Sequence, residues 1–548
     1  MITGIKINNI RNLDFDDYLQ LAPMTILLGK NSSGKSTFLR TFPLIKQTLE
    51  IRRSTPLLWY GNLVDFGSFD DTINKFSEES NKTIKISFKI KDEVPSRFLT
   101  LKRKESTTSE KKIVETSVEI SIMKKIDNEY ISKIEILREN LNFILNLNEK
   151  QELDSIKLND TVIDNLKLKY NILFQELIPT EFHTKNSEKE LYFEKEYIQE
   201  KIFKNFVEVF ELDNEETRKI IQKKLSEVGI ERFRGFNDES DISYVRFPKI
   251  NTLLYFDKNI AFNTDEDFIK KIKKIIPKHL NKINFSEDKI KKLKNLCLML
   301  EIVEMLQYIN IEISNYFKNT SYIAPLRATA QRYYRIQGLD IESIDPTGSN
   351  LPIYLKNLSL ANQLEFSKWT EENFGFKLTF ITNPGHVSLA IQQYNKSFNL
   401  ADTGFGFSQI LPILLQIWSR IFNNDKVIRR RLPWLENNNL VFLIEQPELH
   451  LHPAMQATLI DVFIKAIKLG KKKKINIKFV LETHSETIIN RIGRHIIEEN
   501  LESENVEIMI FENEKDKLEI IKTNITPDGI IEKWPLGFFE PKELLKWL

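Results

Sequence analysis

Hydrophobic and polar residues alternate with two different periods in the first 320 residues. In residues 83–122, short segments such as "IKISFKI" repeat with a period of two, which predicts strands of a sheet. From about residue 124 to residue 320 the chain is rich in Lys, Glu, Asn, Ile and Leu, with helical spacing in "YFEKEYIQEKIFKNFVEVFEL". We therefore expect strands up to residue 122, followed by a mainly helical insertion.

The two ends of the chain show strands that alternate with helices. Near the N-terminus, strand-like stretches at 5–10 and 24–28 precede a helix that begins near Lys35. Alternation of this kind implies a largely parallel sheet covered by helices, and the predicted fold class is α/β. In the C-terminal half the predicted elements are a helix from about Ser408, a strand at 440–445, a helix at 454–468, a strand at 475–481, a helix at 485–499, and strands near 506–511 and 517–522.

Composition narrows the class of protein. The chain has 548 residues, of which 41% are hydrophobic and 28% are charged, as in ordinary globular proteins. Its 79 basic and 77 acidic residues leave a formal net charge of +2, so any nucleic-acid binding has to come from local patches. Cys297 is the single cysteine, which fits a reducing compartment. No stretch has the length of a membrane span, and we expect a cytoplasmic protein without a membrane partner.

A phosphate-binding loop is the strongest chemical signal. The segment "GKNSSGKST" fits the pattern G-x-x-x-x-G-K-[ST], between an apolar strand pattern and a helical one. In this pattern backbone N–H groups surround the β-phosphate, Lys35 reaches the β- and γ-phosphates, and Ser36 is placed for Mg²⁺. The predicted nucleotide-binding residues are Gly29, Lys30, Asn31, Ser32, Ser33, Gly34, Lys35, Ser36 and Thr37.

Three later stretches end in polar residues where a strand gives way to a helix. They are "DTGFGFSQILP" (402–412), "LVFLIEQPELHLHP" (440–453) and "FVLETHSETIINR" (479–491). Glu445 is positioned as a metal-directed carboxylate, and His484 follows the next strand. A parallel sheet gathers its sites at the carboxyl ends of its strands, so we expect these stretches and the phosphate loop to meet at one edge.

Taken together and in this order, the four motifs resemble ABC-type ATPases of the RecF, SMC and OLD-like lineage. The resemblance implies an ATPase head with a mainly parallel sheet and an antiparallel β-subdomain, and implies ATP and Mg²⁺ as ligands. Glu445 then holds the Walker B position, with Ser36 beside the metal, and His484 is the switch histidine. The residues implied as a signature motif, which contacts the ATP bound by a second copy, are Gly404, Gly406, Ser408 and Gln409.

Gln446 departs from the pattern of these ATPases. The residue after the Walker B carboxylate is usually a glutamate that orients or deprotonates the attacking water, and an amide accepts no proton. We therefore expect slow hydrolysis, with ATP serving chiefly to hold two heads together. The alternative is an ordinary ATPase in which Glu448 acts as the base, with help from His484.

Short motifs near the C-terminal end resemble the ATPase family of Septu-type antiphage defence, PtuA, including its retron-linked forms. They are "ETHSE", "IEQPELHLHP" and "TPDGIIEKWPLGFFE". This resemblance implies a homodimer or larger homo-oligomer, a separate HNH nuclease subunit (PtuB), and in retron-linked forms a reverse transcriptase with its DNA product. The resemblance to ABC-type ATPases divides the chain into an N-terminal head part (1–90), an insertion of strands and then helices (91–320) and a C-terminal head part (321–525), which a tail (526–548) follows.

Two other functions remain open. One is a DNA-repair or DNA-tethering ATPase similar to RecF or SMC, and the other is a stand-alone nuclease. Arg327, Arg332 and Arg335, which alternate with tyrosines, suit a DNA or RNA surface or ion pairs between subunits. His450 and His452 have no third ligand nearby, so we expect structural or dimer contacts from them rather than metal binding.

Overall fold

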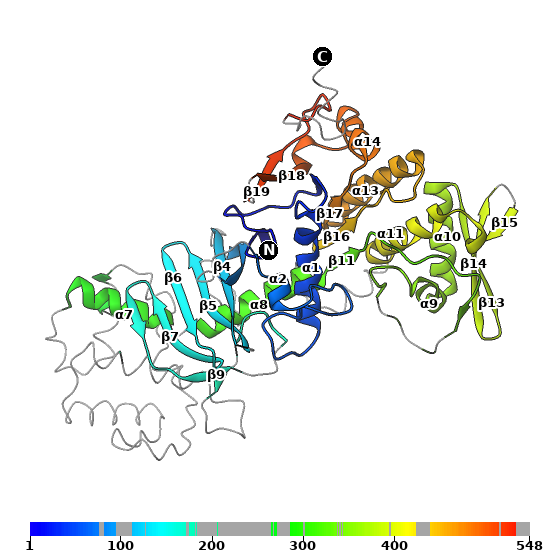
Figure 1. Cartoon of the computed structure of the whole chain (residues 1–548). Coiled ribbons are helices and arrows are strands. Elements are labelled where there is room, and N and C mark those ends of the chain that lie inside the picture. Colours follow the sequence, from blue (N-terminus) through cyan, green and yellow to red (C-terminus); the bar gives the residue numbers. More distant parts are fainter. Residues whose placement is uncertain are drawn as a thin grey trace. The chain divides into compact units, whose positions relative to one another are not determined.

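The computed structural model places the elements shown in Figure 1. It describes residues 1–75, 82–94, 112–126, 128–170, 175–180, 182–183, 205, 265–266, 268–270, 285–299, 302–336, 338, 341, 343–393, 396–422, 439–514 and 517–532. The "WPLGFFE" end of the tail motif and most of the helical stretch at 192–212 lie outside these residues. The chain divides into two compact units. One comprises Met1–Ile2, Arg53–Pro56 and Lys85–Glu312; the other comprises Thr3–Arg52, Leu57–Ile84 and Ile313–Leu548.

The second unit is built around a six-stranded sheet in the order β11-β16-β17-β2-β18-β19. The first five strands are mutually parallel and only β19 runs antiparallel to its neighbour. This confirms the predicted α/β class with a mainly parallel sheet. The strands are β2 (Met24–Gly29), β11 (Thr320–Ile323), β16 (Asn439–Glu445), β17 (Asn476–Glu482), β18 (Val506–Glu514) and β19 (Lys517–Thr523). Another strand of this unit, β1, spans Ile2–Asn8.

The central strands are apolar along their whole length because helices cover them. Every residue of β2 and β16 is buried, which is typical of strands with both faces covered. Helix α1 packs against β2, β11, β16 and β17, and α13 packs against β17. Phe479 of β17 stacks on Phe463 of α13 with ring centroids 4.4 Å apart, and on Phe442 of β16 at 5.1 Å. These contacts fix α13 to the middle of the sheet.

The four helices expected near Lys35, from about Ser408, at 454–468 and at 485–499 are present, with ends that differ from the expected ones by up to five residues. A short helix, α2, begins with a capping box in which Ser68 and Asp71 bind each other's backbone N–H groups. The bounds are α1 (Lys35–Glu50), α2 (Phe69–Thr72), α9 (Leu351–Asn357), α10 (Leu360–Phe374), α11 (Phe405–Phe422), α13 (Pro453–Lys473) and α14 (Glu486–Ile497), with 3-10 turns η4 (Leu400–Asp402) and η5 (Ser503–Asn505). Among the described residues, no helix is long and apolar enough to cross a membrane.

A separate antiparallel sheet also belongs to the second unit. Its strands are β12 (Tyr334–Arg335), β13 (Lys377–Asn383), β14 (His386–Gln393) and β15 (Lys396–Asn399), with β14 paired to the other three. Helix α10 packs on β13, and α9 packs on β14. Because β14 and β15 belong to this sheet, the turn that follows β15 does not end a strand of the parallel sheet.

The other unit contains, among its described residues, a sheet and helical segments. Its sheet has the order β3-β4-β5-β6-β7-β9-β10, and β8 pairs with β7. The strands are β3 (Thr83–Val94), β4 (Lys112–Lys125), β5 (Asn128–Arg138), β6 (Leu141–Leu147), β7 (Glu152–Leu158), β8 (Thr161–Ile163), β9 (Leu168–Tyr170) and β10 (Phe182–His183), and the helices are α7 (Glu287–Met299) and α8 (Ile302–Lys318).

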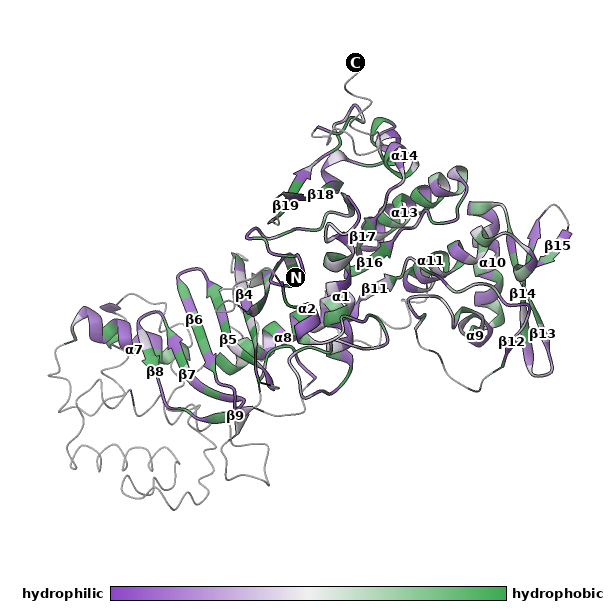
Figure 2. Cartoon of the chain, viewed as in Figure 1, coloured by the Kyte–Doolittle hydropathy of each residue, from purple (hydrophilic) through white to green (hydrophobic). Residues whose placement is uncertain are grey.

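The predicted start of the helical region near residue 124 is wrong, because strands occur as far as residue 183. In β5, Ile134 and Ile136 are buried while the residues between and around them are less buried, which is the period-two pattern of a strand. Figure 2 shows the same alternation of hydrophobic and hydrophilic residues along β5, β6 and β7. The abundance of Lys, Glu and Asn on the polar face concealed this period in the sequence. Helices α7 and α8 do lie in the later part of the insertion.

Candidate nucleotide-binding site

The loop between β2 and α1 is shaped by two glycines. Gly29 has φ +146°, and a Cβ atom there would lie 2.4 Å from the carbonyl oxygen of Phe511. Gly34, with φ +108°, is the N-cap residue of α1. L-residues with side chains rarely adopt such angles, so both positions require glycine. The loop therefore curls directly from a buried strand into the N-terminus of a 16-residue helix, where backbone N–H groups and the helix dipole favour a phosphate.

Lys35 is held inside this loop. Its Nζ atom donates hydrogen bonds to the carbonyl oxygens of Gly29 (2.8 Å) and Lys30 (2.7 Å), and the side chain is buried. Burial lowers the pKa of Lys35, and the nearby Glu482 carboxylate opposes that shift. The ammonium group is thus held in place by the same loop that is predicted to bind the phosphates.

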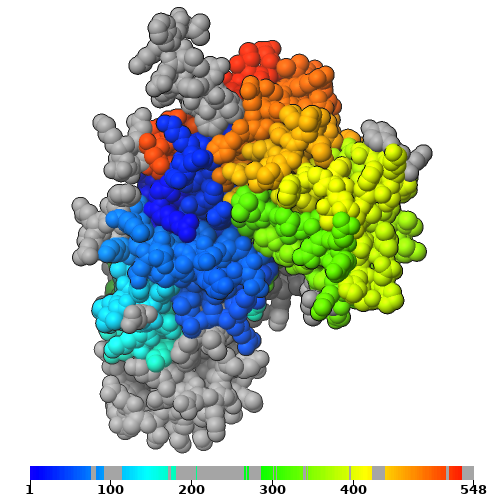
Figure 3. Space-filling view, turned by 45° about the vertical axis from the view of Figure 1, so that its right-hand side comes forward, coloured from blue at the N-terminus to red at the C-terminus, as the bar shows by residue number. Residues whose placement is uncertain are grey.

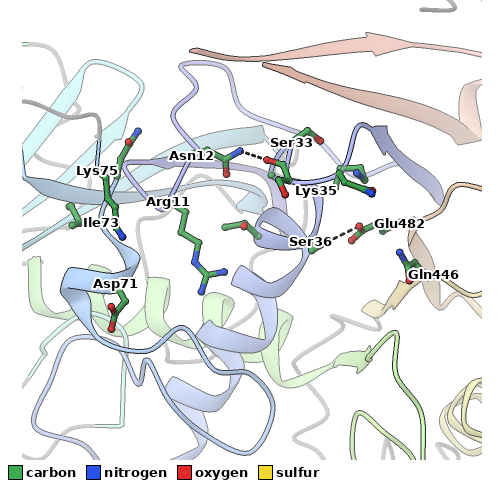
Figure 4. Close-up of a pocket in the computed structure, with 15 residues that line it drawn as sticks. Arg11, Asn12, Ser33, Lys35, Ser36, Asp71, Ile73, Lys75, Gln446 and Glu482 are labelled. Atoms are coloured by element: carbon green, nitrogen blue, oxygen red, sulfur yellow. Dashed lines mark hydrogen bonds between the residues drawn. The ribbon is translucent and has the colours of Figure 1, made fainter. Parts of the chain in front are cut away.

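A pocket of about 610 Å³ opens over the loop. It is lined by residues 31–37, by Arg11 and Asn12, by Asp71 and residues 73–75, and by Gln446 and Glu482. Figure 4 shows the side chains of Arg11, Ser36 and Glu482 around this space. In the space-filling view of Figure 3, the N-terminal segment in blue adjoins the C-terminal segment in orange. The pocket thus combines the phosphate loop with residues more than 400 positions away.

Strand register places two carboxylates side by side at the edge of the sheet. Glu445 and Glu482 are the last residues of β16 and β17 and are paired in register, and Glu482 is also in register with Leu27 of β2. Both glutamates are buried. The predicted convergence at one edge therefore holds for the phosphate loop, for the "IEQPELHLHP" stretch and for the "ETHS" stretch.

Glu445 is surrounded by hydrogen-bond donors. Arg40 of α1 donates from Nε and from Nη2 to its two carboxylate oxygens, each at 2.7 Å, and the Tyr322 hydroxyl donates at 2.8 Å. The hydrogen bonds to Glu445 raise the pKa of Arg40, and burial raises the pKa of Tyr322. The predicted metal-directed carboxylate is thus bound to protein donors on both oxygens.

Glu482 is a site residue that the sequence reasoning passed over in favour of His484. Its Oε1 atom accepts a hydrogen bond from the Ser36 hydroxyl at 2.8 Å, whereas its Oε2 atom is buried without a hydrogen-bond partner among the described residues. Burial, and after it the adjacent Glu445, raises the pKa of Glu482. One signal in the sequence could have revealed it, because Glu482 ends a buried strand just as Glu445 does.

Gln446 and Glu448 occupy the turn after β16 in different ways. Gln446 has a left-handed φ of 44°, lines the pocket, and donates its backbone N–H to the carbonyl oxygen of Glu482 at 2.8 Å. The Glu448 carboxylate accepts hydrogen bonds from the Thr483 hydroxyl and from the backbone N–H of His484, both at 2.8 Å. Glu448 therefore ties the turn after β16 to the turn after β17. Burial, and secondly Lys35, lowers the pKa of His484, which favours a neutral imidazole.

The predicted signature residues do not line this pocket. They lie at the start of α11, which follows β15 of the antiparallel sheet and not a strand of the parallel sheet, and this stretch lies outside the pocket over the phosphate loop. Ser408 is buried beside a second cavity of about 470 Å³, and its hydroxyl donates to the Phe405 carbonyl oxygen at 2.8 Å. Gly404 and Phe405 are exposed, and Gly406 lies against the backbone of His450.

Arg327 connects this turn to the end of β16. The amide of Gln409 donates to the Arg327 carbonyl oxygen at 3.3 Å, and Nη2 of Arg327 donates to the carbonyl oxygens of Glu445 (2.9 Å) and Gln446 (3.2 Å). Burial lowers the pKa of Arg327 to about 10. Arg327 is therefore an interior link and not part of an exposed basic patch, in contrast to the exposed Arg332, which pairs with Asp402 at 2.6 Å.

The two histidines of "HLHP" have contacts of other kinds. The Nδ1 atom of His452 accepts the backbone N–H of Ala454 and caps α13, and the His450 ring lies 5.9 Å from the Phe405 ring. Within the described ranges, no group of three or more His, Cys, Asp or Glu side chains could hold a metal ion. A cation at this site would need other oxygen ligands, such as Ser36 and nucleotide phosphates.

A family model described as an AAA ATPase domain matches residues 1–489. The chain belongs to this AAA ATPase family. The predicted ATPase is confirmed at the level of this family. No curated protein matches it.

The solved structures similar to this AAA ATPase include an SMC head domain and RecF. The SMC head domain from Thermotoga maritima has 8% identity and a TM-score of 0.33, with coverage of 95% of this chain and 98% of that chain. A structure of the recombination mediator RecF with ATP has 12% identity and a TM-score of 0.27, with coverage of 97% of each chain.

The Arg40–Glu445 pair predicts a large stability effect. Arg40→Met leaves Glu445, whose side chain is 2% exposed, without its cation. We expect the free energy of unfolding to fall by about 3–5 kcal/mol, as for other broken buried pairs. Denaturant titration of Arg40→Met, Glu445→Leu and the double variant measures this, and the double variant should recover most of the loss.

The matched control is Arg494→Met, which removes an arginine from an exposed pair with Glu498. That change should leave the unfolding free energy nearly unchanged. An Arg40→Met variant as stable as Arg494→Met would show that Glu445 does not depend on the pair.

Proposed function

We propose that this ATPase binds ATP with Mg²⁺ at the phosphate loop, and that bound ATP joins two copies head to head. The observation that carries the proposal is that the loop, Glu482 and Gln446 surround one pocket while the signature turn lies elsewhere on the same chain. A site divided in this way is complete only when a second copy supplies its own signature turn. The exposed Gly404 and Phe405, next to His450, form the surface available for that contact.

The residues around the loop fit a triphosphate with its cation. Lys35 and the backbone N–H groups of the loop would hold the phosphates. The buried Oε2 atom of Glu482, which has no hydrogen-bond partner among the described residues, lies beside Ser36 and suits a divalent cation. A divalent cation bound there neutralises charge on the β- and γ-phosphates. Gln446 would position the attacking water but accepts no proton, so hydrolysis would be slow.

We further propose that the head dimer assembles and controls a separate nuclease of the HNH type in prokaryotic antiphage defence. The motifs "IEQPELHLHP" and "ETHSE", which resemble those of Septu ATPases, support this role. The dimer would restrain the nuclease and release it when the nucleotide is lost, to the extent that ATP binds the closed state more tightly than the open one.

The dimer makes a direct prediction about mass. Light scattering of the purified chain, alone and co-expressed with its HNH nuclease, should show about a doubling of mass on adding ATP and Mg²⁺. Gly404→Glu should abolish the doubling and keep ATP binding, because a Cβ at Gly404 meets nothing within 4 Å and the change leaves the pocket intact.

Lys396→Glu on the neighbouring β15 is the control, since it also adds negative charge at an exposed position. The Lys396→Glu protein should still double its mass when ATP and Mg²⁺ are added. A Gly404→Glu protein that still doubles its mass would contradict the proposed face. ATPase activity that duplex DNA strongly stimulates without any partner would favour the repair function instead.

Replacing Gln446 with glutamate restores the carboxylate at this position and tests its effect on the hydrolysis rate. Gln446→Glu should raise the single-turnover hydrolysis rate by about 10²-fold or more, because a general base contributes roughly 10²–10⁴. Glu448→Ala should lower stability, since its carboxylate holds Thr483 and the His484 backbone, while its effect on the rate should be smaller. Fast wild-type turnover that is lost only in Glu448→Ala would instead assign the base to Glu448.

A further inference from the structure

The two adjacent buried carboxylates differ in their free hydrogen-bonding capacity. Both oxygens of Glu445 accept bonds from the Arg40 guanidinium, and one also accepts from Tyr322. A cation that bound Glu445 directly would compete with a bidentate ion pair and leave buried donors without an acceptor. Such orphaned groups are costly in a protein interior. Glu445 is therefore satisfied by the protein itself.

Glu482 is not satisfied in this way. One of its oxygens accepts from Ser36, and the other is buried with no hydrogen-bond partner in the described part of the chain. The residue is 4% exposed and yet borders the pocket over the phosphate loop. A buried carboxylate oxygen without a donor or a cation is destabilising, so its retention at a pocket wall points to a ligand.

We propose that Glu482 with Ser36, rather than Glu445, receives the divalent cation that accompanies the nucleotide. This inference rests on the proposed ATP site and adds a ligand to it. Mg²⁺ is commonly bound by one or two carboxylates together with substrate phosphates, and Ser36 occupies the phosphate-loop position that contacts the metal. Arg40 and Glu445 then serve as a positioning pair that neutralises the neighbouring charge.

The test compares ATP affinity with and without the metal. Isothermal titration gives the ATP dissociation constant in Mg²⁺ and in EDTA, and their ratio is the gain due to Mg²⁺. In Glu482→Gln we expect this gain to fall at least tenfold, while the dissociation constant in EDTA changes by less than about threefold, since loss of a metal-supporting group typically costs 10–100-fold in metal affinity. With Mn²⁺ and ATP, the electron paramagnetic resonance signal of bound Mn²⁺ should weaken in parallel.

Glu507→Gln is the matched control, because Glu507 is a half-buried carboxylate on β18 of the same sheet. It should keep the full Mg²⁺ gain. Glu482→Asp keeps the negative charge but shortens the side chain. If Glu482→Gln does not fold, the Glu482→Asp variant tests whether Glu482 binds the cation. We expect Glu482→Asp to lose part of the gain.

The outcomes separate this inference from the proposed function. Wild-type protein that binds ATP in neither buffer would overturn both. Wild-type protein that gains affinity from Mg²⁺, together with Glu482→Gln or Glu482→Asp variants that gain just as much, would overturn the assignment of Glu482 alone and leave the ATP site standing.

Discussion

Two buried carboxylates end neighbouring strands of the parallel sheet, and the site is arranged to balance their charge. Adjacent strands lie about 4.8 Å apart, and at that distance two negative charges repel by roughly 3 kcal/mol at an effective dielectric of about 20. Arg40 compensates Glu445, while Ser36 and Lys35 lie beside Glu482. All three compensating residues belong to α1, so the helix that follows the phosphate loop is tied to the two strand ends by charge as well as by packing.

The same edge of the sheet is also linked to the proposed dimer surface. Arg327 binds the last carbonyl of β16 and the carbonyl of Gln446, and its own carbonyl accepts from Gln409 at the start of α11. A movement of the Gln446 turn therefore acts on the start of α11, where the exposed Gly404 and Phe405 lie. This link offers a physical route by which the state of the nucleotide at one pocket could alter the surface offered to a second copy.

Most elements of the ATPase head could be predicted from the sequence because their patterns are local. The phosphate loop needs only glycine spacing between a strand and a helix, and β16 and β17 are continuous apolar runs that each end in a glutamate. The division between parallel and antiparallel sheets could not be read this way, because strand pairing depends on residues far apart in the chain. For that reason the sequence did not reveal that the "GFGFSQ" turn follows a strand of the antiparallel sheet.

The contacts of individual side chains were the other feature that could not be predicted from the sequence. Nothing local reveals that Arg40 pairs with a residue 405 positions away, or that Arg327 is buried while Arg332, five residues later, is exposed. The strands between residues 128 and 170 were concealed by a polar face rich in Lys, Glu and Asn. In each case the missing information was the tertiary contact that decides which face of an element is covered.

The most direct test of the account is complementation between two inactive copies. Lys35→Ala removes the lysine that is proposed to bind the phosphates, and Gly404→Glu blocks the turn that is proposed to contact the ATP of the second copy. Each variant alone should therefore hydrolyse no ATP. In a symmetric pair, a mixed dimer has one intact site of two, so an equal mixture should recover up to about half of the wild-type rate, because neither variant alone forms the ATP-bound pair. A mixture that stays as inactive as its components would contradict a site shared between two copies.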